Sequence, residues 1–109
     1  MIVNVETHHD LSKLIQTNEK VIIDFWASFC GPCKSIAPFY ENLAASYSQY
    51  NIKFAKANVE IDSISLYADA NGISRIPTFC IFKNGRLIGQ MKGANREGLE
   101  NFVLTLMNS

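Results

Sequence analysis

The sequence predicts an α/β fold with a central, mixed five-stranded sheet flanked by about four helices. Apolar runs of strand length alternate with amphipathic stretches of helical period in the order βαβαβα, which favours parallel strand pairing. The last two strands instead join through Lys83–Arg86, whose Asn-Gly centre is typical of a hairpin. They therefore run antiparallel and make the sheet mixed, and a final amphipathic helix closes the chain.

Five segments have the composition of strands. The run Val21–Trp26 is β-branched and aromatic almost throughout, which is typical of a strand buried on both faces of a sheet. We expect the other strands over residues 2–5, 52–59, 76–82 and 87–91.

Four segments carry apolar residues at intervals of three and four, as amphipathic helices do. The longest follows Cys33 and contains Pro38, which should bend its axis. Its apolar face is formed by Ile36, Phe39, Tyr40, Leu43, Ala44 and Tyr47. The other helices are expected over residues 11–15 after a cap at Thr7 or Asp10, over 64–70 before Asn71-Gly72, and over 95–107 with Asn95 as the cap.

Length and composition indicate one domain over residues 1–109, because 48% of the residues are hydrophobic and 18% are charged. Ten basic and ten acidic side chains cancel, which argues against a nucleic-acid or anionic-membrane partner. No apolar stretch is long enough to span a bilayer, and the N-terminal residues lack the features of a signal peptide. We expect a soluble, cytoplasmic monomer.

Two cysteines lie where the strand at 21–26 gives way to the long helix. Gly31 is expected to allow the tight turn, and Pro32 to occupy the first helical turn, where its missing N–H costs nothing. The positive end of a helix favours thiolate over thiol, and the thiolate is the reactive form. Cys30 is therefore the candidate nucleophile, and Cys33, one turn further in, is the candidate resolving thiol.

The stretch Trp26–Lys34, which reads Trp-Ala-Ser-Phe-Cys-Gly-Pro-Cys-Lys, resembles the active site of the thioredoxin family. Phe29 is a departure, because most of the family has tryptophan immediately before the first cysteine. Phenylalanine removes an indole N–H and keeps an aromatic cover. The resemblance covers nearly the whole chain, since the cysteine motif, a buried Asp, an Ile-Pro-Thr strand, an Asn-Gly hairpin and a final glycine occur in the family's order.

The resemblance implies the thioredoxin fold and a general protein-disulfide reductase that maintains cell redox homeostasis. Dithiol–disulfide exchange would run through a Cys30–Cys33 disulfide tuned by Gly31 and Pro32. It also implies that no cofactor is bound and that electrons come from NADPH through a flavoprotein thioredoxin reductase. The implied clients are disulfide-containing proteins such as peroxiredoxins or reductases.

Asp24 is the one charged residue within the apolar run at 21–26. Burial of a carboxylate is costly and should raise its pKa, which suits a group that takes and returns a proton. The resemblance implies that this carboxyl assists deprotonation of Cys33. Asn58 stands where we expect the lysine that bacterial members pair with this carboxylate, so Asp24 is predicted to lack that cation.

The run Ile76-Pro77-Thr78 is, by itself, a strand opened by a proline. The resemblance implies a cis peptide before Pro77, packed against the cysteine pair. The backbone of Ile76 would then be free to pair with an extended substrate segment. Together with Trp26, Phe29 and Gly93, these residues are the predicted docking surface for clients.

Three alternatives are weaker. A zinc site would need four ligands, and only Cys80 and two adjacent N-terminal histidines could join the cysteine pair, so we expect no metal. A thioredoxin-like binding or adaptor module without essential turnover would not need an intact cysteine pair and Asp24. An oxidase or isomerase of the secretory type tends to have His between its cysteines, whereas this chain has Gly31-Pro32 there.

Cys80, on an apolar strand, is expected to be a small buried hydrophobe.

Overall fold

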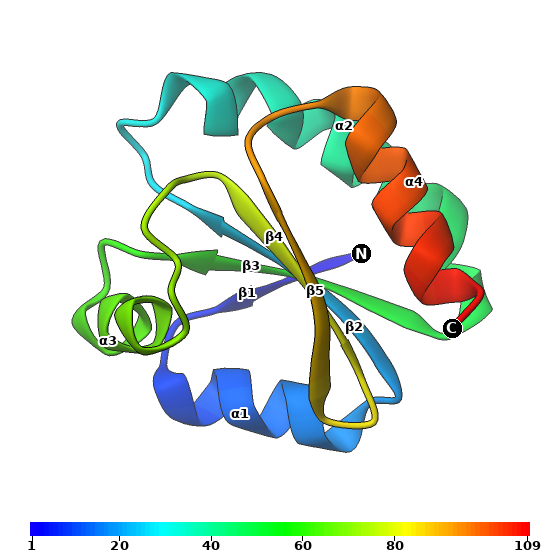
Figure 1. Ribbon diagram of the computed structural model, residues 1–109, viewed down its shortest axis with the longest axis horizontal. Coiled ribbons are helices and arrows are strands. Elements are labelled where there is room, and N and C mark those ends of the chain that lie inside the picture. The colour runs from blue at the N-terminus through cyan, green and yellow to red at the C-terminus, as the bar shows by residue number, and fades with distance from the viewer.

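The computed structural model describes all 109 residues of the sequence (Figure 1). Strands and helices follow one another in the order βαβαβαββα, as predicted. Their bounds are β1 (Ile2–Val5), α1 (His8–Thr17), β2 (Lys20–Trp26), α2 (Gly31–Tyr47), a 3₁₀ turn (Ser48–Tyr50), β3 (Ile52–Asn58), α3 (Asp62–Ala70), β4 (Thr78–Lys83), β5 (Arg86–Lys92) and α4 (Arg96–Met107).

The five strands form one mixed sheet in the order β1-β3-β2-β4-β5. Strand β3 is parallel to both β1 and β2, whereas β4 runs antiparallel to β2 and β5 antiparallel to β4. The hairpin between β4 and β5 turns through Asn84 (φ 52°) and Gly85 (φ 82°), the left-handed pair that an Asn-Gly turn requires. The predicted mixed α/β sheet with four helices is confirmed.

Helices α1 and α3 cover one face of the sheet, and α2 and α4 cover the other (Figure 1). Side chains alternate along β2, so Val21, Ile23 and Phe25 pack into the core beneath α1 and α3. Ile22 points the other way, into the core beneath α2 and α4. Asp24 and Trp26 share that second face with Ile22, because they follow it at intervals of two.

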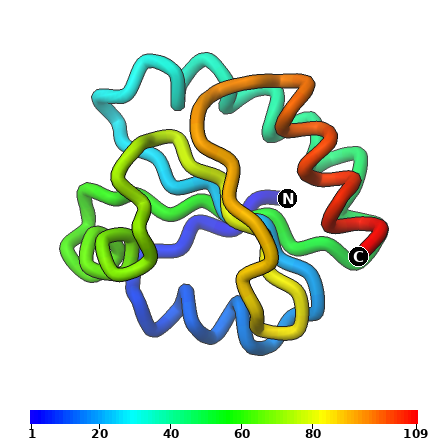
Figure 2. The backbone as a smooth tube through the Cα atoms, in the orientation of Figure 1, coloured from blue at the N-terminus to red at the C-terminus, as the bar shows by residue number.

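Three connections meet at one end of the sheet, where the backbone trace brings β2–α2, α3–β4 and β5–α4 together (Figure 2). These segments carry the predicted cysteine pair, the Ile76–Pro77 sequence and Gly93. Strand β4 begins at Thr78, two residues later than predicted, because Pro77 has no N–H to donate to a neighbouring strand. The topology therefore collects the predicted site residues at a single edge.

The helices begin and end close to their predicted positions. Thr7 caps α1 by accepting the Asp10 amide, and Asn95 caps α4 by accepting the Gly98 amide. Pro38 lies within α2, which continues past it to Tyr47. None of the helices is long and apolar enough to cross a lipid bilayer.

Candidate functional site

Cys30 and Cys33 form a disulfide at the N-terminus of α2, with their Cα atoms 5.3 Å apart. Cys30 is the N-cap residue of that helix, and its sulfur accepts a hydrogen bond from the Cys33 amide at 3.2 Å. The helix thus directs an unpaired backbone N–H, and the positive end of its dipole, at the sulfur of Cys30. Cys30 is 8% exposed and Cys33 3%, so the first cysteine is the more accessible.

Gly31 and Pro32 fill the first two positions of α2. Pro32 stands where a missing N–H is tolerated, as predicted. The predicted reason for Gly31 is wrong, because its φ is not positive and a Cβ there would meet no atom within 4 Å apart from its chain neighbours and its own helix backbone. The turn does not need glycine.

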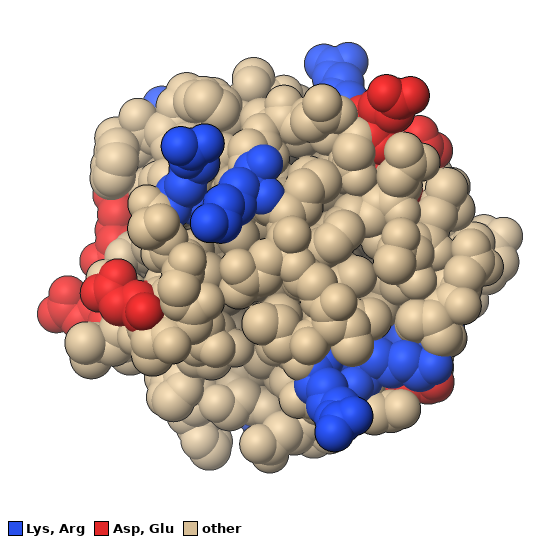
Figure 3. Space-filling model, viewed as in Figure 1, with Lys and Arg blue, Asp and Glu red and all other residues tan.

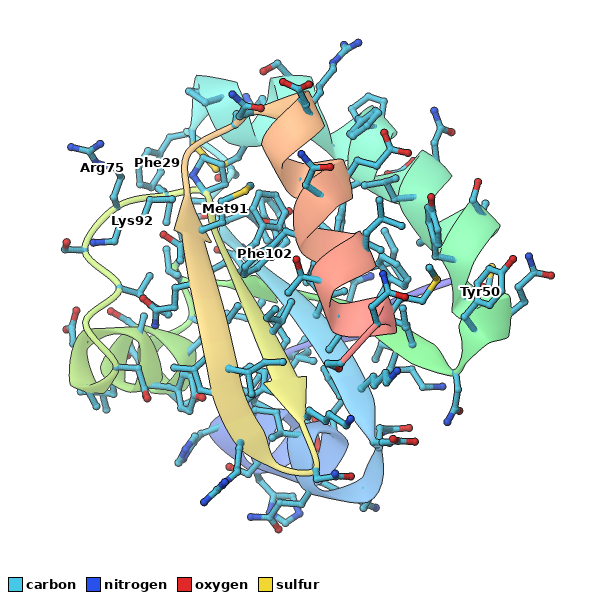
Figure 4. All side chains as sticks on the ribbon, turned by 45° about the vertical axis from the view of Figure 1, so that its right-hand side comes forward. Phe29, Tyr50, Arg75, Met91, Lys92 and Phe102 are labelled. Atoms are coloured by element: carbon cyan, nitrogen blue, oxygen red, sulfur yellow. A yellow bond between two sulfur atoms is a disulfide. The ribbon has the colours of Figure 1, made fainter.

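An apolar rim surrounds the disulfide. Trp26, Val59 and Ile76, all partly buried, pack against the small cluster of Ala27 and the two cysteines. Phe29 is 74% exposed and lies at this end of the molecule (Figure 4). An exposed aromatic ring of this size next to a reactive bond is a natural contact for an apolar partner.

The Ile76–Pro77 peptide is cis, as the resemblance implies. Two hydrogen bonds fix the loop around it: the Thr78 hydroxyl donates to the Arg75 carbonyl, and the Gly93 amide donates to the Pro77 carbonyl at 2.8 Å. Gly93 has φ +94°, a conformation that glycine adopts without strain. Neither main-chain polar group of Ile76 bonds within the chain, which leaves both available to a bound strand.

Asp24 is fully buried on the face of β2 that α2 covers, and neither of its carboxylate oxygens has a hydrogen-bond partner. Desolvation raises the pKa of this carboxyl from its ordinary 3.8 to about 7, and the positive charge of Lys56 opposes part of that rise. A carboxyl with a pKa near neutrality can both accept and return a proton at physiological pH.

The prediction that Asp24 lacks a nearby cation is wrong. Lys56, not residue 58, is the cross-strand partner of Asp24 in the parallel pairing of β2 and β3. Its ammonium group lies 4.7 Å from the centre of the Trp26 ring, a cation–π contact. Asn58 instead shapes the β3–α3 connection, where its side-chain oxygen accepts the Glu60 amide at 2.8 Å.

Two further contacts at the site were not expected from the sequence. The hydroxyl of the fully buried Tyr40 lies 2.8 Å from the Ala55 carbonyl oxygen and 3.2 Å from that of Ile22, so α2 is tied to the strands that carry Lys56 and Asp24. Both carboxylate oxygens of Glu60 accept hydrogen bonds from Ser28, and these bonds lower the pKa of Glu60. Tyr40 belongs to the apolar pattern of α2, which does not indicate what its hydroxyl contacts. Ser28 and Glu60 lie too far apart in the chain for a local sequence pattern to link them.

Cys80 lies apart from the pair. It is 1% exposed in the core beneath α1 and α3, and burial raises the pKa of its thiol to about 12. This supports the interpretation of Cys80 as a buried hydrophobe, since such a thiol is unreactive at neutral pH. The structure does not group three or more His, Cys, Asp or Glu side chains in a way that could hold a metal ion.

Comparison with known proteins gives a consistent result. The sequence model of the thioredoxin family matches residues 2–105. A thioredoxin from Coprinus comatus is 37% identical over 103 residues, which cover 94% of this chain and 95% of that protein. A solved thioredoxin structure from Plasmodium falciparum is 36% identical, covers 94% of this chain and 97% of its own, and superimposes with a TM-score of 0.87.

A third match comes from a structural study of how a yeast mitochondrial 1-Cys peroxiredoxin is resolved by glutathione and thioredoxin systems. That chain is 32% identical, with 96% of this chain and 95% of its own covered and a TM-score of 0.87. Fold, cysteine spacing and sequence agree over almost the full length. The chain belongs to the thioredoxin family, and its Cys30–Cys33 pair makes it a protein-disulfide oxidoreductase that works by dithiol–disulfide exchange.

Proposed function

We propose that the chain works in the reducing direction, with Cys30 as the nucleophile and Cys33 as the resolving thiol. The observation that carries this division is the hydrogen bond from the Cys33 amide to the Cys30 sulfur at the tip of α2. In the reduced protein the same amide and helix end would stabilise a thiolate on Cys30. Cys33 receives no such bond and is the less exposed of the two.

The exchange takes two displacements. The Cys30 thiolate attacks one sulfur of the client disulfide, forms a mixed disulfide, and releases the other client sulfur as a thiolate. The Cys33 thiolate then attacks the Cys30 sulfur and releases the second client thiol. Two electrons pass to the client, and the protein is left with the Cys30–Cys33 disulfide that the structure contains.

We assign Asp24 the role of accepting the proton of the resolving thiol, Cys33. Its carboxylate takes the proton when Cys33 becomes a thiolate and returns it to a departing client sulfur. The raised pKa supports this role, because a group with a pKa of about 7 is partly ionised at neutral pH. Lys56 keeps the pKa from rising further, so the carboxyl remains a usable base.

Clients would dock around the disulfide on a surface formed by Trp26, Phe29, Ile76, Pro77 and Gly93, which shares its first three residues with the apolar rim. Gly31 and Pro32, which lie between the two cysteines at the start of α2, are assigned the redox tuning of the pair. The free main-chain groups of Ile76 support binding of an extended segment by strand pairing.

The reducing cycle requires a source of electrons, for which we propose NADPH acting through a flavoprotein thioredoxin reductase, with no cofactor bound to this chain. The proposed clients are disulfide-containing proteins, including peroxiredoxins, a class that the yeast study connects with thioredoxin systems. We propose that the chain is a monomer with one domain, residues 1–109. In the cytoplasm, the proposed compartment, it would carry electrons and maintain redox homeostasis.

The test is the reduction of insulin disulfides with dithiothreitol as the electron source. Cys30→Ser should lower the rate to that of dithiothreitol alone, because no nucleophile remains at the helix tip. Cys80→Ala is the matched control and should retain full turnover, since Cys80 lies in the core away from the site. Full turnover by Cys30→Ser would refute the nucleophile assignment. A slow wild type that still binds clients tightly would favour the alternative, an adaptor module.

A further inference from the structure

Two exposed cations flank the cis-proline loop. Arg75 immediately precedes Ile76, whose side chain packs against the disulfide cluster. Lys92 is the cross-strand partner of Thr78 at the start of β4. The hydrogen bonds from the Thr78 hydroxyl and the Gly93 amide hold this loop together. Both charges are therefore anchored to the same rigid segment that borders the reactive bond.

Neither of these side chains forms a hydrogen bond, an ion pair or a cation–π contact within the molecule. Two other cations near the site lie against aromatic rings: Lys56 lies over Trp26, and the Arg96 guanidinium lies 5.8 Å from the centre of the Phe39 ring. Lys34, which follows Cys33 on α2, is also exposed but does not belong to the cis-proline loop. Arg75 and Lys92 instead extend into solvent beside Phe29 (Figure 4). Figure 3 shows basic side chains gathered over this end of the sheet, without an acidic side chain among them.

Glu60, an acidic residue that contacts the disulfide loop through Ser28, is placed on the opposite flank. Glu60 follows β3, which pairs with β2 on the side away from β4. Its two oxygens are occupied by Ser28. The sheet order therefore separates Glu60 from Arg75 and Lys92. We call the side formed by Arg75 and Lys92, along the cis-proline loop, the positive flank. The whole chain has no net charge, so any attraction is local to this flank.

A strand paired with the main chain of Ile76 would run past Arg75, the residue before Ile76, and close to Lys92, the cross-strand partner of Thr78. Side chains of such a strand alternate in direction and advance by about 3.3 Å per residue. The residues within about two positions of the client cysteine would consequently come within reach of the long side chains of Arg75 and Lys92. A carboxylate at those positions gains a charge-assisted contact, whereas a lysine is repelled.

We propose that Arg75 and Lys92 form a selectivity element that favours protein clients whose reducible cysteine lies in an extended acidic segment. The proposal rests on the reductase function proposed above and names the class of client for the same site. Phe29 would supply the apolar contact common to all clients, and the two cations would discriminate among them by charge.

The experiment uses two synthetic peptides, each closed by one disulfide, that are identical except for glutamate or glutamine on both sides of one cysteine. The pre-reduced full chain is mixed with each peptide, and the rate constant for disulfide reduction is measured by acid quenching and chromatography. At low ionic strength we expect the glutamate peptide to react about threefold to tenfold faster, the range for one or two exposed ion pairs. Salt at about 0.5 M should remove the difference.

The double variant Arg75→Gln/Lys92→Gln should reduce both peptides at equal rates while keeping the wild-type rate on the glutamine peptide. The matched control is Lys13→Gln/Lys53→Gln, which removes two exposed charges elsewhere and should keep the preference. Equal rates for both peptides with the wild type, or a preference that survives in the Arg75/Lys92 double variant, would overturn the proposal. Failure of the reductase function itself would be distinct, because then neither peptide would be reduced.

Discussion

At the scale of single residues, the site depends on a carboxyl group in a buried environment that disfavours its charged form. The Asp24 carboxyl is buried without a hydrogen-bond partner, and Lys56 is its one charged neighbour across the sheet. Burial of a carboxyl without a hydrogen-bond partner costs stability, and its presence at the site supports a role in the chemistry.

Asp24 should make the stability of the protein depend on pH. Its pKa is about 7 in the folded chain against 3.8 ordinarily, so between these values the folded state retains a proton that the unfolded state has lost. The free energy of unfolding therefore falls as pH rises through this window, by about 4 kcal/mol in total at about 1.4 kcal/mol per pH unit. Below the window both states are protonated, and above it the loss is complete.

The measurement is urea unfolding of the oxidised protein and of Asp24→Asn at about pH 5 and about pH 8. The variant should gain about 3 kcal/mol relative to wild type between these two conditions, because its amide does not ionise. It should also keep its fold and reduce insulin more slowly than wild type at neutral pH. The same pH dependence in both proteins would contradict the raised pKa, and an unchanged turnover rate would remove the proton-transfer role.

Two glycines at the site should respond differently to alanine. Gly93→Ala forces an L-residue into φ +94° and should lower the free energy of unfolding by about 1–2 kcal/mol. Gly31→Ala places a methyl group in open space at the start of α2 and should change it by less than about 0.5 kcal/mol. Chemical unfolding of both variants checks the pair. Equal losses would show that the backbone conformations differ from those described.

At the scale of elements, helix α2 carries both cysteines, and its position over the sheet depends on more than its apolar face. The Tyr40 hydroxyl reaches the main-chain carbonyls of Ile22 in β2 and Ala55 in β3, which come shortly before Asp24 and Lys56 in their strands. The strands, helices, hairpin and caps could be predicted from the sequence, because their signals are local patterns. The Tyr40 contact could not, since an apolar period says nothing about where one hydroxyl points.

Removal of that hydroxyl should loosen α2 at the sheet. Tyr40→Phe removes the one buried proton that the hydroxyl shares between the Ala55 and Ile22 carbonyls, and it should lower the free energy of unfolding by about 1–2 kcal/mol. Tyr47→Phe is the control on the same helix, and its effect should be smaller because the Tyr47 hydroxyl makes no hydrogen bond within the chain. Urea unfolding of the two variants checks this, and equal effects would argue against the anchoring role.

At the scale of the whole molecule, the sheet order brings three distant connections to one edge and so assembles the disulfide, the cis-proline loop and Gly93 (Figure 2). The family resemblance supplies most of this assembly in advance, including the cysteine pair and the buried Asp24. The resemblance places the expected cation at position 58, two residues after Lys56, which is the cation actually opposite Asp24. This register is fixed only when β2 pairs with β3, so the sequence alone does not give it. The positive flank at Arg75 and Lys92 also requires the three-dimensional arrangement.

Trapping of a mixed disulfide distinguishes the nucleophilic role of Cys30 from the resolving role of Cys33. Reduced Cys33→Ser and reduced Cys30→Ser are each mixed with a disulfide peptide, and the covalent adduct is measured by mass spectrometry and mapped to its cysteine. Cys33→Ser should accumulate an adduct on Cys30, and Cys30→Ser should form little adduct in the same time. Adduct formation on Cys33 at a comparable rate would contradict the assignment of Cys30 as the nucleophile.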